Sequence, residues 1–405
     1  MPRLTLIVAC AVLLTPIAAV AQDEPTRADE WRQLREAKAT ALTPPAPGRI
    51  ERVLLALENG RLFERLLSPA EGFYPKIGQV TSGGGFAAGP AYRRLGLLGE
   101  RADLTAFAMG SVKRYWLADA RLSFPRLADG RVFAEVYGRR FDFAQEPFFG
   151  IGPASDRANA SEYGIGTTEI GASGGVKPTA WLALGGTMSH VAPDAWPTDD
   201  PRSIDRVFDA TTLPGFAADP RFLRTSVFAD LNYREPRGNP RAGGRYLLSL
   251  EHYDDRNGGR FSFNRFEADL QQYISLLRHR RVIALRGLVS TTDPARGATV
   301  PFYLQRTLGG PDDLRGFRRF RFRDDHLLVL QAEYRWEIFT AVDGALFYDA
   351  GKVATTRGDL NFDDLESDYG IGFRFGTANG VFLRIEGAFG SSGGKHFIFR
   401  FGHVF

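Results

Sequence analysis

The sequence predicts an all-β fold class: a 16-stranded antiparallel transmembrane β-barrel with a short helical N-terminal extension. Hydrophobic and polar side chains alternate with a period of two from about residue 73 to the last residue, which is typical of strands with one apolar and one polar face. No apolar run long enough for a membrane-spanning helix follows the first 21 residues. The 405 residues include 32 Phe, 13 Tyr and 45 Gly. Phe and Tyr favour strands and lipid–water interfaces.

Residues 1–21 have the organisation of a secretory signal peptide. Arg3 supplies the positive charge, residues 4–14 are apolar, and Ala19-Val20-Ala21 is a small-x-small cleavage site. An uncleaved membrane anchor and a lipoprotein signal at Cys10 are the alternatives, but the apolar stretch continues past Cys10. We therefore expect export through a cleaved signal peptide. Because Cys10 is the only cysteine, we expect no disulfide, cysteine-based zinc site or cysteine nucleophile in the mature chain.

Residues 22–72 form a short, charged and Pro-rich extension. Residues 22–40 are polar and compatible with a helix, residues 44–48 break that pattern, and residues 49–67 carry apolar side chains at helical spacing. We expect a short periplasmic segment whose second half packs as a helix on the next domain. A role at the membrane surface or as a plug is the alternative. The β-barrel is expected to span residues 73–405.

The alternation is clearest over residues 328–338. Leu328, Leu330 and Tyr334 fall on one face, and Glu333 and Arg335 fall on the other. Such strands fit two kinds of sheet. In a soluble sandwich the apolar face forms the core, whereas in an outer-membrane barrel the apolar face contacts lipid and the polar face lines the lumen. Strands of about ten residues favour the barrel. So do connections that alternate between short turns, such as residues 175–177, and long polar loops, such as residues 192–219. The predicted strands are 74–81, 85–94, 102–111, 114–125, 131–143, 161–174, 178–191, 222–234, 244–254, 264–277, 280–290, 327–338, 344–353, 368–376, 381–389 and 396–405.

The last residues alternate aromatic side chains on one face. Phe397, Phe399, Phe401 and the final residue Phe405 follow this pattern. It resembles the C-terminal sorting signal of outer-membrane barrels, which the barrel-assembly machinery recognises. The resemblance implies that the protein lies in the bacterial outer membrane. It also implies contact with the assembly machinery during biogenesis, and with outer-membrane lipid and lipopolysaccharide afterwards.

A Gly-rich segment at residues 308–317, between the eleventh and twelfth strands, reads Leu-Gly-Gly-Pro-Asp-Asp-Leu-Arg-Gly-Phe. Residues 314–317 resemble the V-R-G-F/Y motif on the sixth surface loop of the bacterial surface antigen superfamily. These barrels are relatives of the central subunit of the barrel-assembly machinery and of two-partner secretion transporters. They assemble or translocate proteins at the outer membrane. In that family the loop folds back into the lumen, and its Arg meets carboxylates on the two following strands.

The resemblance implies a lumen loop lock, by which we mean this loop held inside the barrel by its arginine. Arg315, Gly316 and Phe317 are the loop residues, and the matching carboxylates are Glu333 in Ala-Glu-Tyr-Arg and Asp349 in Phe-Tyr-Asp-Ala-Gly, where the glycine is Gly351. A guanidinium is permanently charged and forked, so it can bridge two carboxylates. A glycine beside the arginine allows the backbone to turn sharply and approach the wall closely.

The resemblance implies insertion or translocation of proteins at the outer membrane. Family members usually carry periplasmic POTRA domains, and the stretch between the cleavage site and Phe73 is too short for one. We therefore expect no POTRA domain, and either a separate periplasmic partner or a direct protein client. The alternative function is a passive pore or small-solute transporter. Its lumen would be lined by Asp230, Arg374, Arg384, Glu386 and Arg400.

A lumenal or surface-active enzyme is a third reading. Residues 390–394 match the nucleophile-elbow string G-x-S-x-G, but they fall at a predicted hairpin turn rather than before a helix. We therefore expect no enzyme activity, and no cofactor or metal site. The 51 basic and 47 acidic residues nearly balance, so nucleic acid is not an expected partner.

Overall fold

The computed structural model describes residues 71–400, apart from residues 82, 278, 340, 378–379 and 392–393. The expected signal peptide, residues 1–21, and residues 22–70 of the expected extension lie outside the described residues. Phe401 and Phe405 of the expected sorting signal also lie outside them. In the described part of the chain, no helix is both long and apolar enough to span a bilayer.

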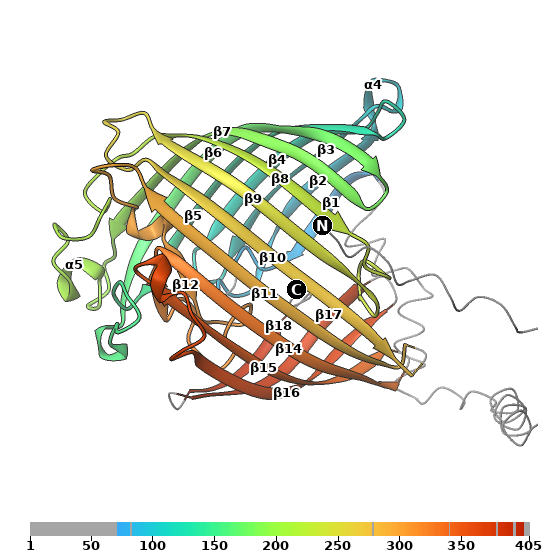
Figure 1. Ribbon diagram of the computed structural model, residues 1–405. Coiled ribbons are helices and arrows are strands. Elements are labelled where there is room, and N and C mark those ends of the chain that lie inside the picture. The colour runs from blue at the N-terminus through green and yellow to red at the C-terminus, as the bar shows by residue number, and fades with distance from the viewer. Residues whose placement is uncertain are drawn as a thin grey trace, which may run out of the picture. The chain divides into compact units, whose positions relative to one another are not determined.

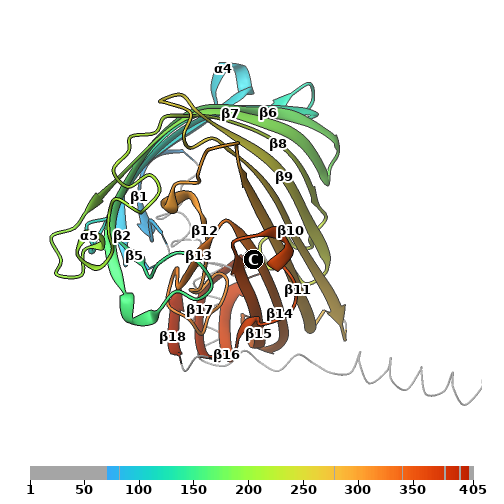
Figure 2. The same ribbon diagram turned by 60° about the vertical axis from the view of Figure 1, so that its left-hand side comes forward.

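Sixteen strands form one antiparallel sheet in which each strand pairs with its neighbour in sequence (Figure 1), so the predicted fold class and strand number are confirmed. The sheet curves into a wide arch around a central space (Figure 2). Within residues 71–400 as described, the first and last strands of the sheet do not pair with each other. The strands are β1 (Gly72–Gly78), β2 (Ala87–Gly96), β3 (Ala102–Ser111), β4 (Trp116–Leu127), β5 (Val132–Phe148), β6 (Ser161–Thr179), β7 (Leu182–Pro197), β8 (Phe222–Asn232), β9 (Gly243–Asp255), β10 (Phe263–Leu276), β11 (Arg281–Pro294), β14 (His326–Phe339), β15 (Val342–Ala354), β16 (Glu366–Thr377), β17 (Gly380–Gly390) and β18 (Lys395–Arg400).

The two faces of the sheet differ in the way that the alternation predicts. Successive side chains of a strand point to opposite faces, so one face collects every second residue. The outer face exposes large apolar side chains, including Val136, Ile170, Met188, Val227, Leu250, Leu346, Tyr348, Tyr369 and Phe373. The inner face buries charged and polar ones, including Asp119, Glu169, Arg265, Gln271, Glu333, Asp349, Arg374 and Glu386. An apolar outer belt around a polar interior is the arrangement of outer-membrane barrels.

Three neighbouring strands are longer than the alternation predicts. β5 and β7 continue to Phe148 and Pro197, and β6 continues to Thr179. Residues 175–177 therefore lie inside β6, which corrects their assignment to a turn. Gly175 suits this strand because a β-carbon there would lie 2.8 Å from the Phe133 ring. Gly175 thus allows a close approach of the neighbouring strands instead of marking a turn.

The connections carry the remaining elements. These are the short helices α4 (Leu97–Glu100), η1 (Arg157–Asn159), α5 (Ile204–Val207), η2 (Phe302–Leu304) and η3 (Arg357–Asp359), and a separate two-stranded sheet of β12 (Arg306–Leu308) and β13 (Phe322–Asp324). The longest connection, loop 295–325, joins β11 to β14 and contains η2, β12 and β13.

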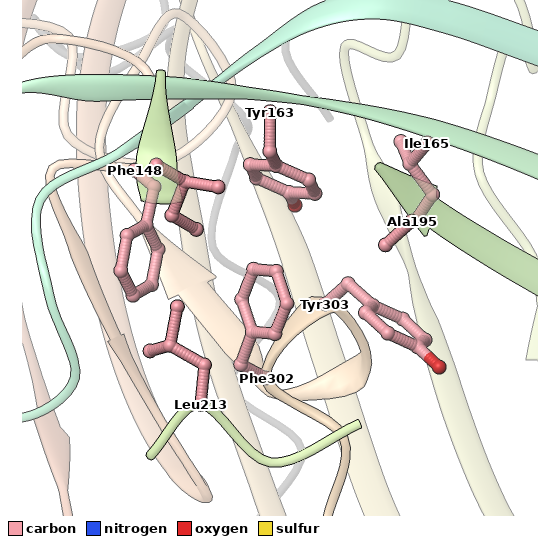
Figure 3. Close-up of a cluster of buried hydrophobic side chains, with 8 residues drawn as sticks. Phe148, Tyr163, Ile165, Ala195, Leu213, Phe302 and Tyr303 are labelled. Atoms are coloured by element: carbon pink, nitrogen blue, oxygen red, sulfur yellow. The ribbon is translucent and has the colours of Figure 1, made fainter. Parts of the chain in front are cut away.

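A hydrophobic cluster joins two long connections, residues 198–221 and loop 295–325, to the ends of three strands. Figure 3 shows seven of its side chains labelled, converging from the ends of β5, β6 and β7 and from the loops: Phe148, Tyr163, Ile165, Ala195, Leu213, Phe302 and Tyr303. The Arg323 guanidinium is buried beside them, where it donates to the Phe302 carbonyl at 2.6 Å and to the Tyr163 hydroxyl at 3.2 Å. Loop 295–325 is therefore fixed to the wall at this end by apolar packing around a buried cation.

Candidate functional site

Loop 295–325 enters the space inside the arch through a tight turn. Gly309 and Gly310 both have a φ of 110°, which L side chains rarely adopt, and the Gly310 amide donates to the Leu314 carbonyl at 3.0 Å. The turn rests on an apolar cluster that joins the loop to β11, β14 and β15. Its members are Leu288, Leu308, Leu314, Phe317, Phe322, Leu327, Val329 and Val353. Burial of these side chains offsets part of the conformational entropy lost when a long loop is ordered.

Arg315 lies at the tip of this turn, with its side chain fully buried. Its guanidinium donates to both carboxylate oxygens of Asp349, at 2.6 Å from Nε and 2.7 Å from Nη2. Nη1 donates to Glu333 at 3.1 Å and to Glu386 at 3.2 Å. The ring of Phe347 lies 3.5 Å from the guanidinium carbon, so the cation also has an aromatic partner. Arg315 therefore contacts three strands, namely β14, β15 and β17.

Glu333 and Glu386 have further cationic partners. Glu333 also accepts from Arg335 and from Arg374, and Glu386 accepts from Arg374 at 3.4 Å. The sequence predicted that Arg374 and Glu386 line the lumen, but it did not predict that they lie near Arg315. The only indication in the sequence was that both residues fall on the polar face of their strands, β16 and β17. Their proximity to Arg315 depends on pairing across four strands, which alternation alone does not specify.

Gly316 fits a narrow space between the loop and the wall. Its amide donates to Asp368 Oδ2 on β16 at 2.9 Å. A β-carbon at this position would lie 2.5 Å from the backbone nitrogen of Gly390 and 2.6 Å from the β-carbon of Asp368. Glycine is therefore required here for close approach to β16 and β17. Gly351 has a similar role on β15, where a β-carbon would lie 2.6 Å from the Leu328 carbonyl oxygen and 3.2 Å from Leu308.

The buried charges nearly balance. The guanidiniums of Arg315, Arg335, Arg374 and Arg384 lie among the carboxyl groups of Glu333, Asp349, Asp368 and Glu386, and all eight side chains are almost fully buried. Moving charges out of water is costly, and only close pairing with good hydrogen-bond geometry repays that cost. Burial alone would lower the pKa of Arg315, but its carboxylate partners, Asp349 foremost, raise it above its ordinary value.

The neighbouring loop residues Asp312 and Asp313 are held by other strands. Arg286 on β11 donates to the Asp312 carbonyl at 3.3 Å, and Gln331 on β14 donates to the Asp313 carbonyl at 2.9 Å. The Asp312 carboxylate pairs with Arg400 on β18. Burial raises the pKa of Asp313 to about 6, although nearby Arg286 opposes this shift. The loop tip is therefore held by its backbone as well as by Arg315.

The loop also reaches the opposite part of the sheet. Arg319 donates to Glu146 on β5 at 2.6 Å and to Thr81 at 3.3 Å. Arg306 pairs with Glu267 on β10 at 2.9 Å. Together with Arg315, these contacts tie one loop to strands on both sides of the space inside the arch.

A cavity of about 400 Å³ lies beside the loop, between the last strand and the β1–β2 connection. Gln79, Gly83 and Gly85 line one side, and residues of β18 line the other. Phe397 and Phe399 of the expected sorting signal are 77% and 53% exposed, whereas Ile398 between them is buried. The described part of β18 thus presents two aromatic rings on its outer face, next to an edge with no paired strand.

The remaining lumen residues named from the sequence are paired. Asp230 accepts from Arg245 at 3.0 Å, and Arg384 lies 3.3 Å from Glu386. Within residues 71–400, outside the gaps given above, no cluster of His, Cys, Asp and Glu has the arrangement of a metal site.

One comparison with known proteins identifies a family, and another identifies a similar fold. The model of the Omp85 superfamily domain matches residues 94–405, which is more than half of the chain. The fold is similar to the crystal structure of BamA from Haemophilus ducreyi lacking POTRA domains 1–3. The TM-score is 0.61 at 14% identity, covering 81% of this chain and 69% of that one. CdiB from Acinetobacter baumannii matches with a TM-score of 0.49 at 12% identity, over 81% of this chain and 57% of that one. No curated protein sequence matches the chain.

Proposed function

Since the chain belongs to the Omp85 superfamily, we propose that it inserts or translocates proteins at the outer membrane while Arg315 holds loop 295–325 inside the barrel. The family resemblance predicted from residues 314–317 is confirmed by the match over residues 94–405. Omp85 members lie in the bacterial outer membrane. The similarity to BamA supports a barrel fold, in which the polar face of the sheet lines the lumen.

One observation carries this proposal: Arg315 is fully buried and bonded to carboxylates of three strands. Burying the Arg315 cation and its three carboxylate partners costs free energy, because charges are taken out of water. This cost is offset only when the loop has one fixed position in which the charges pair closely. A loop that only connects two strands does not require a buried ion-pair site. If part of the sheet opens and closes, a loop bonded to β14, β15 and β17 would hold these three strands together while it does so.

The position of β1 and β18 at the two edges of the sheet supports a wall that opens. Among the described residues, these two strands do not pair with each other. Unpaired edges accept additional strands readily. In our proposal a client chain enters there, delivered by a separate periplasmic partner or directly from the periplasm. Lipid and lipopolysaccharide contact the exposed apolar belt.

A passive pore remains the second candidate because charged side chains line the interior. The ion pairs of Asp230 and Arg384, and the loop that crosses the interior, argue against a steady open channel. The proposal includes no catalytic chemistry. Gly390 ends β17 and Lys395 begins β18, so residues 391–394 connect two strands, whereas a nucleophile elbow precedes a helix.

The test is insertion of an unfolded outer-membrane protein into liposomes that contain this barrel. We expect the wild type to accelerate folding of the client. A disulfide tether between cysteines introduced on β1 and β18 is expected to abolish the acceleration, and reduction is expected to restore it. Equal acceleration with and without the tether would contradict entry between these strands. Planar-bilayer recording distinguishes the passive pore from the insertion barrel. A passive pore would show a large steady conductance that is the same in the wild type and in Arg315→Ala.

A further inference from the structure

The connection between β8 and β9, residues 233–242, lies at the end of the strands opposite to loop 295–325. In an antiparallel sheet whose strands follow in order, successive connections alternate between the two ends. Other connections at this end are short, such as residues 180–181 between β6 and β7 and residues 340–341 between β14 and β15. Connection 233–242 is thus unusually long for its end of the sheet.

The extra length forms a compact segment with a closed neck. The Glu235 amide donates to the Ala242 carbonyl at 2.9 Å, and the Glu235 carbonyl accepts from the Arg241 and Ala242 amides at 2.9 Å and 3.1 Å. Beyond this neck, Asn239 and Pro240 are buried although they belong to a connection. The segment therefore folds against the protein instead of extending into solvent.

Connection 233–242 crosses to distant strands. The Arg241 guanidinium donates to both oxygens of Asp343 on β15, at 2.9 Å and 2.8 Å, and to the His279 carbonyl at 3.1 Å. The Pro240 carbonyl accepts from Arg335 on β14 at 3.4 Å. β15 is the fourth neighbour of β9 in the sheet, which corresponds to about 19 Å of wall at the usual strand spacing. The connection therefore bridges the lumenal side of the wall across several strands.

Arg335 is where this connection meets the network of Arg315. Arg335 pairs with Glu333, which lies two residues away on the same face of β14 and also accepts from Arg315 at 3.1 Å. Glu333 thus binds loop 295–325 through Arg315, and Arg335, which pairs with Glu333, binds connection 233–242 through the Pro240 carbonyl. Displacing the loop or the connection therefore changes the position and the charge balance of the Glu333–Arg335 pair that holds the other.

We infer that connection 233–242 is a second latch, which closes the end of the lumen opposite to loop 295–325, and that the two are energetically coupled through Glu333 and Arg335. Release of one latch lowers the cost of releasing the other. A client or partner that displaces connection 233–242 at its own end therefore loosens the loop at the far end. This inference is independent of the insertion activity, because it concerns only how the lumen is closed.

Trypsin digestion of the folded barrel in lipid tests the coupling, because cleavage tracks the open population when reclosing is fast. Arg318 provides a cleavage site in loop 295–325, and Arg237 provides one in connection 233–242. We expect Arg241→Ala to accelerate cleavage after Arg318 by about fivefold or more, and Arg315→Ala to accelerate cleavage after Arg237 by a similar factor, since coupling is reciprocal.

Arg237→Ala is the matched control for the Arg318 site. Its side chain belongs to the same connection and, within the described part of the chain, donates to the nearby Ala180 carbonyl at 3.1 Å and to no residue of β14 or β15. It is expected to leave cleavage after Arg318 unchanged. Asp343→Asn serves as a milder variant should Arg241→Ala prevent folding, and heat-modifiable gel migration reports folding of every variant. Unchanged cleavage after Arg318 in both folded variants, or equal acceleration by Arg237→Ala, would overturn the inference.

Bilayer recording gives an independent readout. With two latches, Arg241→Ala and Arg315→Ala each leave one end closed, and the double variant is expected to conduct far more than the sum of the single variants. Conductance of Arg315→Ala equal to that of the double variant would show that connection 233–242 closes nothing. Failure of the insertion assay would leave these results unaffected, so the two proposals are tested separately.

Discussion

Replacing Arg315 with alanine tests the strongest contact in the site. The change removes four hydrogen bonds: two to Asp349, one to Glu333 and one to Glu386. Glu333 and Glu386 retain other arginines. Asp349 keeps the hydrogen bond from Gln331 at 3.2 Å and lies opposite Asp368 on β16, but neither of these neighbours carries a positive charge. The loss is therefore mainly the cost of leaving one buried carboxylate without its cation.

Breaking a buried ion pair by removing one partner costs about 3–5 kcal/mol. Because about 1.36 kcal/mol corresponds to a factor of ten, the open population of loop 295–325 should rise roughly a hundredfold to several thousandfold. Subtilisin digestion of the folded barrel measures this population, since the protease cleaves the loop only when it leaves the wall. Heat-modifiable migration confirms that the variant has folded.

Arg318→Ala is the control, because Arg318 is exposed and lies three residues from Arg315 in the same loop. Its digestion rate should match that of the wild type. The double variant Arg315→Met, Asp349→Leu removes the stranded charge together with its partner, and is expected to recover most of the loss. A digestion rate of Arg315→Ala within about threefold of the wild type would refute the reasoning, since a buried ion pair cannot be broken at so small a cost.

Three further changes follow from the same contacts. Gly316→Ala is expected to displace the loop tip, because its β-carbon would lie 2.5 Å from the Gly390 nitrogen; faster digestion measures this, and a wild-type rate would contradict it. Asp368→Asn should leave the rate within about twofold, because Asn keeps an oxygen acceptor for the Gly316 amide, whereas Asp368→Leu removes that acceptor and should release the loop. Asp313 has a folded-state pKa of about 6, above its ordinary value, so its ionisation opposes docking; the loop is held most firmly below about pH 4 and less firmly as pH rises through 6. Digestion between about pH 4 and 7 should show this dependence, with a plateau above the folded-state pKa, and Asp313→Asn should reduce it; an identical pH profile in both proteins would contradict it.

Much of the fold follows from local pattern. The alternation over β14 assigned Glu333 to the polar face, because side-chain alternation is local in sequence. Its pairing with Asp349 and Arg315 was implied by the family resemblance and not by the local pattern. Strand ends were harder to predict. Gly175 has turn chemistry, yet it continues β6 because the neighbouring Phe133 ring fills the space above it.

Contacts across the sheet could not be predicted. Glu386 meets Arg315 only because β17 and β14 are brought together around the loop. The burial of Pro240 and the reach of Arg241 to Asp343 depend on how a connection folds back, and its sequence carries only ordinary turn residues. The aromatic surroundings of Arg323 likewise assemble from residues of separate strands and loops.

A structure of the full-length barrel determined by electron cryomicroscopy in lipid nanodiscs tests the central claim most directly. The account predicts the apolar belt in the lipid, loop 295–325 inside the barrel, and the Arg315 guanidinium within hydrogen-bond distance of both Asp349 oxygens. Density for the loop outside the barrel, with Arg315 in bulk water, would contradict it.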